Sequence, residues 1–229
     1  MKFSFIVLLL GSALGCASPE GLPRGYVISQ HNQESVLKYL RPALLSRGGA
    51  GRIYYSTACK TRDGASLPFP RVEVRPPSKE TTGLVAVREI FKNDKRVMVS
   101  EDRSGMIRIT IGQPASALLQ TRIHLVTLKL HEQYNAILAI FAIENTTEVE
   151  VAERKLGFDH PNIVFGGGIN LPEKGVRFPH RPASMKDLTM DQALDAVART
   201  FGGIVVHETC AERSGKRLVP LDFVQVADF

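Results

Sequence analysis

The chain has 229 residues, of which 44% are apolar, and it carries 29 Lys and Arg residues against 23 Asp and Glu residues. These values exclude an acidic disordered tail, a multi-span membrane protein and a small domain held together mainly by disulfides. They leave one or two globular modules of moderate size with a mildly basic surface.

The first residues have the composition of an export signal. Lys2 supplies one positive charge, the run 3–10 contains a single polar residue, and small residues follow up to Cys16. A charged start, a short apolar run and a small-residue end are typical of a secretory signal peptide. The run is much shorter than the roughly 20 residues that a transmembrane helix needs. We therefore expect an export signal over 1–17 and a tether, spaced by Pro and Gly, over 18–31.

The section 32–78 is predicted to hold a helix followed by short strands. Apolar residues recur at helical spacing over 33–46, and the pair Gly48-Gly49 marks the end of the helix. Residues 52–59 and 72–74 have the composition and alternation of strands.

The section 79–158 is predicted to begin with a helix and a hairpin. Apolar residues at 86, 87, 90 and 91 fall on one face of a helix, and residues 96–101 and 106–111 alternate as two strands around a turn. Four further elements are expected in this section: a short helix over 114–120, a strand over 123–130, and helices over 134–143 and 149–156.

Residues 159–185 are rich in Gly and Pro, so we expect an irregular connection there. The section 186–229 then begins with a helix whose first residues, Thr189 and Gln192, have the spacing of a capping box. This helix is expected to end at Gly202-Gly203. The strands expected after it cover 204–209 and 218–226.

The two helix-and-hairpin sections match each other when the sequence is shifted by 107 residues. Five positions are identical, pairing Lys79, Thr82, Ala86, Val99 and Glu101 with Lys186, Thr189, Ala193, Val206 and Glu208. The sequence therefore predicts an α+β fold of small helix-plus-hairpin modules, preceded by a helix and short strands. A duplication would explain the match, and convergence on a common helix–strand–strand plan is the alternative.

The segment 187–206 resembles the secretin and TonB N-terminal short domain. It has Leu188-Thr189 at the helix start, apolar residues along one helix face, a Gly, and then a β-branched strand. The segment 83–130 is similar in the order of its elements. The resemblance implies a module that binds protein partners through exposed strand edges or stacks into rings, and strand addition supplies main-chain hydrogen bonds for such binding. The residues expected in the interaction strands are Val97, Val99, Ile204 and Val206.

Cys16, which follows small residues, resembles the acylated cysteine of bacterial lipoprotein signals. This resemblance implies a diacylglycerol on its thiol and, because Ala17 rather than Asp follows it, a location at the outer membrane. Ordinary secretion with cleavage after Gly15 or Ala17 is the alternative. In an oxidising compartment, Cys59 and Cys210 form one disulfide bridge or remain separate thiols.

The sequence contains no catalytic or metal-binding signature. The six histidines lack the spacing of metal ligands. His207, Glu208 and Cys210 are close in the sequence, but strand alternation places His207 and Glu208 on opposite faces. The acidic group at 144, 148, 150 and 153 is expected to be a solvated helix face. No catalytic residue, metal or cofactor is predicted.

Basic residues cluster near 92–96 and 213–217 and are expected to give only weak attraction to anionic surfaces. The chain has no Trp and 7% aromatic residues, so platforms for stacking bases are scarce and no nucleic-acid partner is predicted.

These observations predict an exported, lipid-anchored protein on the periplasmic face of the outer membrane. It would bind other envelope proteins by strand-edge or surface contact, without catalysis. The alternative is a secreted hydrolase or a small-ligand or glycan-binding protein. Its cleft would lie between the two halves and use His207, Glu208 or the acidic group.

Overall fold

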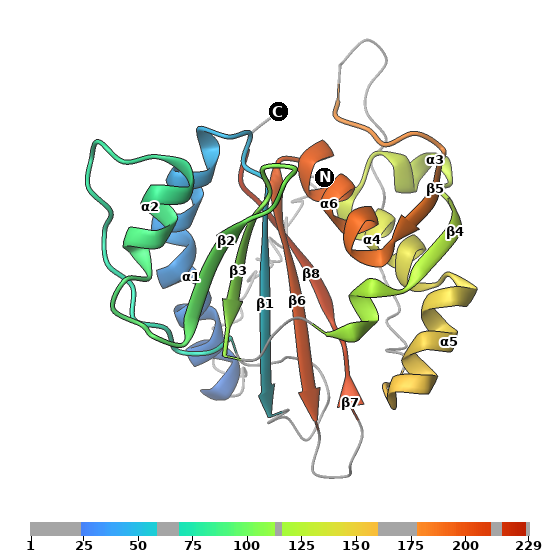
Figure 1. The fold of residues 1–229 in the computed structure, drawn as a ribbon, viewed down its shortest axis with the longest axis horizontal. Helices are drawn as coiled ribbons and strands as arrows, with labels where there is room; N and C mark the ends of the chain where they lie inside the picture. Colours follow the sequence, from blue (N-terminus) through green and yellow to red (C-terminus); the bar gives the residue numbers. More distant parts are fainter. Residues whose placement is uncertain (1–23, 59–68, 113–115, 160–177, 212–216, 228–229) are drawn as a thin grey trace, which may run out of the picture.

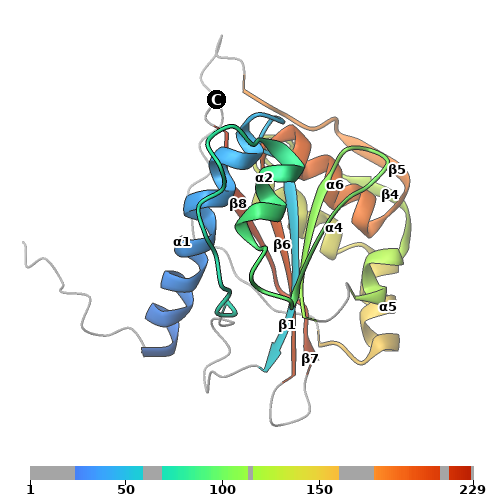
Figure 2. The ribbon, with the colours of Figure 1, turned by 60° about the vertical axis from the view of Figure 1, so that its left-hand side comes forward.

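The computed structural model describes residues 24–58, 69–112, 116–159, 178–211 and 217–227. At its centre is a six-stranded mixed sheet with helices on both faces (Figures 1 and 2). The fold is α+β, as the sequence predicts.

The main sheet is built around three parallel strands. Its strands, in spatial order, are β2 (Val97–Glu101), β3 (Ile107–Ile111), β1 (Gly51–Ala58) and β6 (Gly203–Ala211), with β7 (Arg217–Leu218) and β8 (Leu221–Gln225) both paired to β6. β1 is parallel to β3 and to β6, whereas β2, β7 and β8 are antiparallel to their neighbours. A separate two-stranded antiparallel sheet is formed by β4 (Arg122–Thr127) and β5 (Ser184–Thr189).

Each face of the main sheet has its own hydrophobic cluster. One face, here the α1/α2 face, is covered by α1 (Arg24–Leu45) and α2 (Gly83–Ile90). The other, the α4/α6 face, is covered by η1 (Ala117–Gln120), α4 (Ala136–Glu144), α5 (Thr147–Leu156) and α6 (Met190–Thr200), and α3 (Leu130–Gln133) precedes α4. Side chains of β1 alternate between the faces, so Ile53 and Tyr55 join the first cluster and Tyr54 the second.

The helix-and-hairpin elements lie where the sequence predicts them, and the Thr189–Gln192 capping box at the start of α6 is confirmed. The tether over 18–31 is wrong from residue 24 onward, because α1 already begins at Arg24. The signal region 1–17 lies outside the described residues.

Three further predictions differ from the structure, two for strands and one for a connection. Residues 72–74 pair with no strand in the described part of the chain, because the main-chain N–H of Glu73 donates to the Asp94 carboxylate instead of to a neighbouring strand. The connection over 159–185 ends earlier than expected, since β5 begins at Ser184 and pairs with β4. The final strand over 218–226 is divided at Pro220 into β7 and β8.

The duplication is not confirmed, because the two sections occupy unequal places in one shared sheet. In the first section, Val97 and Val99 pack on the same face as their helix α2. In the second, Ile204 and Val206 pack on the α1/α2 face, opposite to their helix α6. β2 is an edge strand, whereas β6 has a neighbour on each side.

Candidate functional site

β2 forms one edge of the main sheet and carries two of the predicted interaction residues, Val97 and Val99. Both side chains are half-buried against the α1/α2 face. Between them, Met98 points to the opposite side and is 57% exposed. The structure therefore places this half of the predicted interaction surface at an accessible edge (Figure 1).

The main-chain bonds that flank the β2–β3 pair show which residues of β2 point outward. Arg96 and Asp102, just before and just after β2, both bond through their main chain to residues flanking β3. Alternate residues bond across an antiparallel pair, so Val99 and Glu101 direct their N–H and C=O groups away from β3. No described residue bonds to these outward groups.

The other two predicted interaction residues are not accessible. Ile204 and Val206 are at most 1% exposed, and β6 is paired with β1 on one side and with β7 and β8 on the other. The expectation that β6 offers an edge is therefore wrong, because the last strands of the chain cover it.

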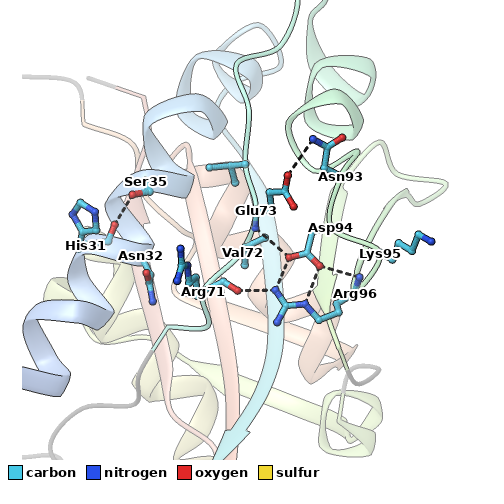
Figure 3. Close-up of a pocket in the computed structure, with 11 residues that line it drawn as sticks. His31, Asn32, Ser35, Arg71, Val72, Glu73, Asn93, Asp94, Lys95 and Arg96 are labelled. Atoms are coloured by element: carbon cyan, nitrogen blue, oxygen red, sulfur yellow. Dashed lines mark hydrogen bonds and ion pairs between the residues drawn. The ribbon is translucent and has the colours of Figure 1, made fainter.

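A groove of about 1080 Å³ lies between the N-terminal part of α1, the extended segment 71–74 and the turn 93–96 (Figure 3). Asp94 connects two of the segments that line this groove. The Asp94 carboxylate accepts hydrogen bonds from the Arg96 guanidinium and from the main-chain N–H of Glu73. The bond from Arg96 holds the pKa of Asp94 well below its usual range. With Arg71 and Lys95 beside Glu73 in the lining, the groove presents charges of both signs.

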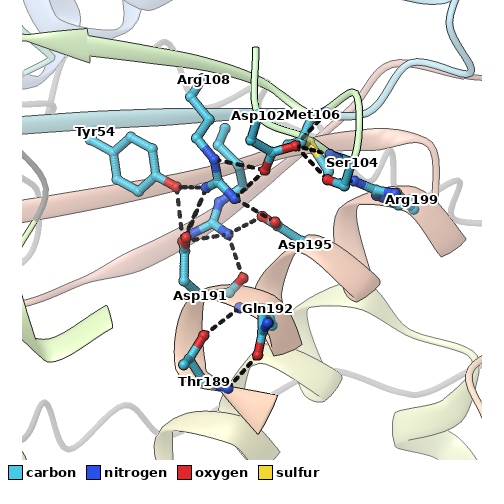
Figure 4. Close-up of polar contacts among 11 residues, drawn as sticks. Tyr54, Asp102, Ser104, Met106, Arg108, Thr189, Asp191, Gln192, Asp195 and Arg199 are labelled. Atoms are coloured by element: carbon cyan, nitrogen blue, oxygen red, sulfur yellow. Dashed lines mark hydrogen bonds and ion pairs between the residues drawn. The ribbon is translucent and has the colours of Figure 1, made fainter. Parts of the chain in front are cut away.

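On the α4/α6 face, four charged side chains form a compact ionic cluster between the sheet and α6 (Figure 4). Arg52 on β1 lies 2.7 Å from Asp195 and 3.1 Å from Asp191, both on α6. Arg108 on β3 contacts the same two carboxylates at 2.5 and 3.0 Å. Tyr54 donates a hydrogen bond to Asp191 and accepts one from Arg108. The cluster therefore fixes the start of α6 to two neighbouring strands.

This ionic cluster is closed to solvent at Arg52, which is 0% exposed. Its Nε and Nη2 atoms, and both ring nitrogens of nearby His207, have no hydrogen-bond partner among the described residues. Burial, followed by repulsion from Arg52, lowers the pKa of His207 to about 3, so the imidazole is neutral. The sequence reasoning did not find Arg52, Arg108, or their partners. The sequence did contain one sign of this cluster. Asp191 and Asp195 are four residues apart, so they lie on the same side of α6, beside its apolar face.

His207 and Glu208 lie on opposite faces of β6, as strand alternation predicts. The His207 ring is 6.0 Å from that of Tyr54 on the α4/α6 face. Glu208 accepts a hydrogen bond from the Tyr55 hydroxyl on the other face. Burial and the neighbouring Asp222 raise the pKa of Glu208 to about 8. The two side chains therefore do not converge on one reacting atom.

The acidic group is not a solvated helix face throughout. Glu144 and Glu153 are each 2% exposed, because α4 and α5 turn these side chains inward. Burial, and then repulsion from Glu153, raise the pKa of Glu144 to about 8. Glu148 is half-buried and accepts a hydrogen bond from the main-chain N–H of His124.

Cys210 is buried in β6, where its main chain pairs with Thr57 of β1 and Leu218 of β7. Cys59, two residues beyond Thr57, and Cys16 lie outside the described residues. The Cys59–Cys210 bridge therefore stays a prediction.

Comparison with protein-family models, curated proteins and solved structures finds no match for the chain. Within the described ranges, no group of three His, Cys, Asp or Glu side chains could hold a metal ion. No helix in the described part of the chain is long and apolar enough to cross a membrane.

Proposed function

We propose that this chain is an exported, lipid-anchored envelope protein that binds an extended segment of a partner protein as an added strand beside β2. The outward-pointing main-chain groups of Val99 and Glu101 carry this proposal. They form a regular row of donors and acceptors without partners among the described residues. An extended peptide is the ligand that satisfies such a row.

The side chains of β2 give this edge two different surfaces for recognition. Val97 and Val99 extend the apolar cluster under α2, whereas Met98 and Ser100 are exposed on the other side. A partner strand places alternate side chains on the same two surfaces. An apolar residue of the partner would therefore contact Met98, whose flexible thioether adapts to different shapes.

A peptide selection on the intact mature protein tests the proposal. Peptides enriched from a display library should protect the Val99 and Glu101 amides from hydrogen exchange. Val99→Pro should abolish their binding, because Pro removes the outward N–H while Val99 makes no ladder bond to β3.

Val99→Ala is the matched control, since it loses the same half-buried side chain but keeps the N–H. Its binding should stay within about threefold of the parent, as the main-chain bonds remain. Peptides that bind equally well to Val99→Pro, or that leave the β2 amides unprotected, would show that the edge is not the binding surface.

The lipid anchor is tested separately by the intact mass of the protein isolated from a bacterial envelope. A diacylglyceryl adduct on Cys16 supports the anchor, and an unmodified product cleaved after Gly15 or Ala17 contradicts it. The mass before and after reduction also tests the Cys59–Cys210 bridge, because reduction adds two hydrogens for each disulfide.

A further inference from the structure

The carboxyl ends of β1 and β6 lie at a point where the chain connections separate. From β1 the chain passes through α2 on one face before it reaches β3. From β3 it passes through α6 on the opposite face before it reaches β6, on the other side of β1. In open sheets with parallel strands, such a switch in direction leaves a crevice at the carboxyl ends, where ligands bind.

A pocket of about 190 Å³ lies at this place. Figure 1 shows the neighbouring carboxyl ends of β1 and β6. Ser56 on β1 and Thr209 on β6 are direct neighbours in the sheet and both line it. Ser116, just before η1, and Arg217 on β7 line it from other elements. Four polar side chains from four different elements or their flanks therefore line one small pocket.

The Arg217 side chain is held in place before any ligand arrives. Its guanidinium carbon lies 4.3 Å from the centre of the Phe158 ring, and Phe158 is buried. One of its nitrogens donates to the Leu156 carbonyl at the end of α5, at 2.9 Å. The other donors of the guanidinium have no described partner, and Arg217 forms no ion pair with a described carboxylate.

The three hydroxyls of the pocket can all donate a hydrogen bond to a ligand. Ser116 Oγ accepts from the main-chain N–H of Leu118, which leaves its own hydrogen available. The hydroxyls of Ser56 and Thr209 have no hydrogen-bond partner among the described residues. None of the described residues that line the pocket is acidic. The groove of Figure 3 differs in this respect, since Glu73 and Asp94 line it.

We propose that this pocket binds a small oxyanion, a phosphate or sulfate group, through the Arg217 guanidinium and the hydroxyls of Ser56, Ser116 and Thr209. A guanidinium forms paired, charge-assisted hydrogen bonds with such groups. The pocket, at about 190 Å³, is much smaller than the groove of about 1080 Å³ in Figure 3, and suits a single tetrahedral group rather than a polymer. The proposal is independent of strand addition at β2, which lies at the far edge of the sheet.

The test is a titration of inorganic phosphate, and separately of sulfate, into the isotope-labelled mature protein in Tris–chloride buffer. The amide signals of Ser56, Leu118 and Thr209 should shift together with one dissociation constant. Arg217→Gln should weaken binding by about tenfold or more, the usual value of a charge-assisted hydrogen bond. Thr209→Val, which preserves the shape, should weaken it by a few-fold.

Arg122→Gln is the matched control, because Arg122 is an exposed arginine on β4 outside the pocket. It removes the same charge and should leave the dissociation constant unchanged. An equal loss in Arg122→Gln and Arg217→Gln would show attraction to net charge only, and would overturn the proposal. If millimolar phosphate and sulfate shift none of the three amides, and vesicles that carry a phosphate monoester are not bound either, the proposal is also overturned.

Two sources of the phosphate group are separated by a vesicle experiment. Vesicles of phosphatidylcholine with phosphatidic acid present a phosphate monoester on a lipid, and pure phosphatidylcholine vesicles are the control. Arg217-dependent binding to the former, without binding of free phosphate, assigns the site to a lipid headgroup. Binding of free phosphate alone assigns it to a soluble ion. The proposal is wrong if neither probe shows a dependence on Arg217.

Discussion

The two faces of β1 are packed by different physical means. On the α1/α2 face, Ile53 and Tyr55 join a cluster of aliphatic and aromatic side chains. On the α4/α6 face, Arg52 lies in an ionic cluster with two carboxylates of α6, and only further along the strand does Tyr54 join apolar neighbours. Removing apolar atoms lowers the free energy of unfolding in proportion to the number removed. Removing one partner of a buried ionic cluster lowers it steeply, because the other charge stays buried without compensation.

The largest effect is expected from breaking the ionic cluster. Asp195→Ala leaves Arg52 and Arg108 each short of a carboxylate at a buried place, so the free energy of unfolding should fall by about 3–5 kcal/mol. Urea unfolding followed by circular dichroism measures it. Asp159→Ala, at an exposed side chain, is the control and should change stability by less than about 0.5 kcal/mol.

On the apolar face, Leu44→Ala should cost about 3 kcal/mol, because Leu44 is 0% exposed and its loss leaves a cavity under α1. Combined with Asp195→Ala, the losses should be additive, since the sheet separates the two sites. A double variant whose loss departs from the sum by more than about 1 kcal/mol would show that the faces are coupled.

The α4/α6 face should also make stability depend on pH. Burial raises the pKa of Glu144 to about 8 in the folded protein, from its ordinary value of 4.5. The folded state therefore holds a proton that the unfolded state releases. Stability is full below the unfolded pKa, falls by about 1.4 kcal/mol per pH unit as the pH rises from there towards 8, and levels off above the folded pKa of about 8.

Glu144→Gln should remove much of this slope, since an amide carries no charge to bury, so its stability relative to the parent should rise by about 1.4 kcal/mol for each pH unit between pH 5 and pH 7. Urea unfolding at pH 5, 7 and 8.5 measures the slope. Glu148→Gln is the matched control at the start of α5. Hydrogen bonds from main-chain N–H groups lower the pKa of Glu148, so this variant should keep the slope of the parent above pH 5. An unchanged slope in Glu144→Gln would show that other groups carry the dependence, Glu208 first among them.

The smallest changes in the free energy of unfolding are expected from replacing either of the two adjacent tyrosines of β1. Tyr54→Phe removes a hydroxyl that bonds both Asp191 and Arg108, and should cost about 1–2 kcal/mol. Tyr55→Phe removes one bond to Glu208 and should cost about 1 kcal/mol or less. If Tyr55→Phe lost more stability than Tyr54→Phe, the polar contacts of the α4/α6 face would not be the stronger ones, contrary to this expectation.

Local signals in the sequence were sufficient for the helices and hairpins but not for their arrangement. The capping box at Thr189 and Gln192 is a short-range feature and was predicted correctly. β5 was missed because Ser184 to Thr189 is largely polar and its pairing with β4 is long-range. The predicted duplication was not confirmed for the same reason. A matching sequence pattern does not specify on which face of a sheet a helix packs.

The candidate sites show the same division. Val97 and Val99 were found because an alternating strand is visible in sequence, but nothing local shows that β8 covers Val206. Arg52 appeared to be an ordinary polar residue of a strand, since burial of a cation depends on partners more than a hundred residues away. The pocket at Ser56 and Arg217 joins residues from five separate elements or their flanks, and no spacing rule connects them.

The position of β1 between two different interiors also fixes the phase of the strand. Its side chains alternate with a period of two, so deleting one residue near Gly51 would turn Arg52 toward the aliphatic cluster and Ile53 toward Asp195. Each error would be costly by itself, and both would arise together. The alternation of Arg52 and the apolar Ile53 along β1 therefore specifies a single pairing register of this strand with β3 and β6.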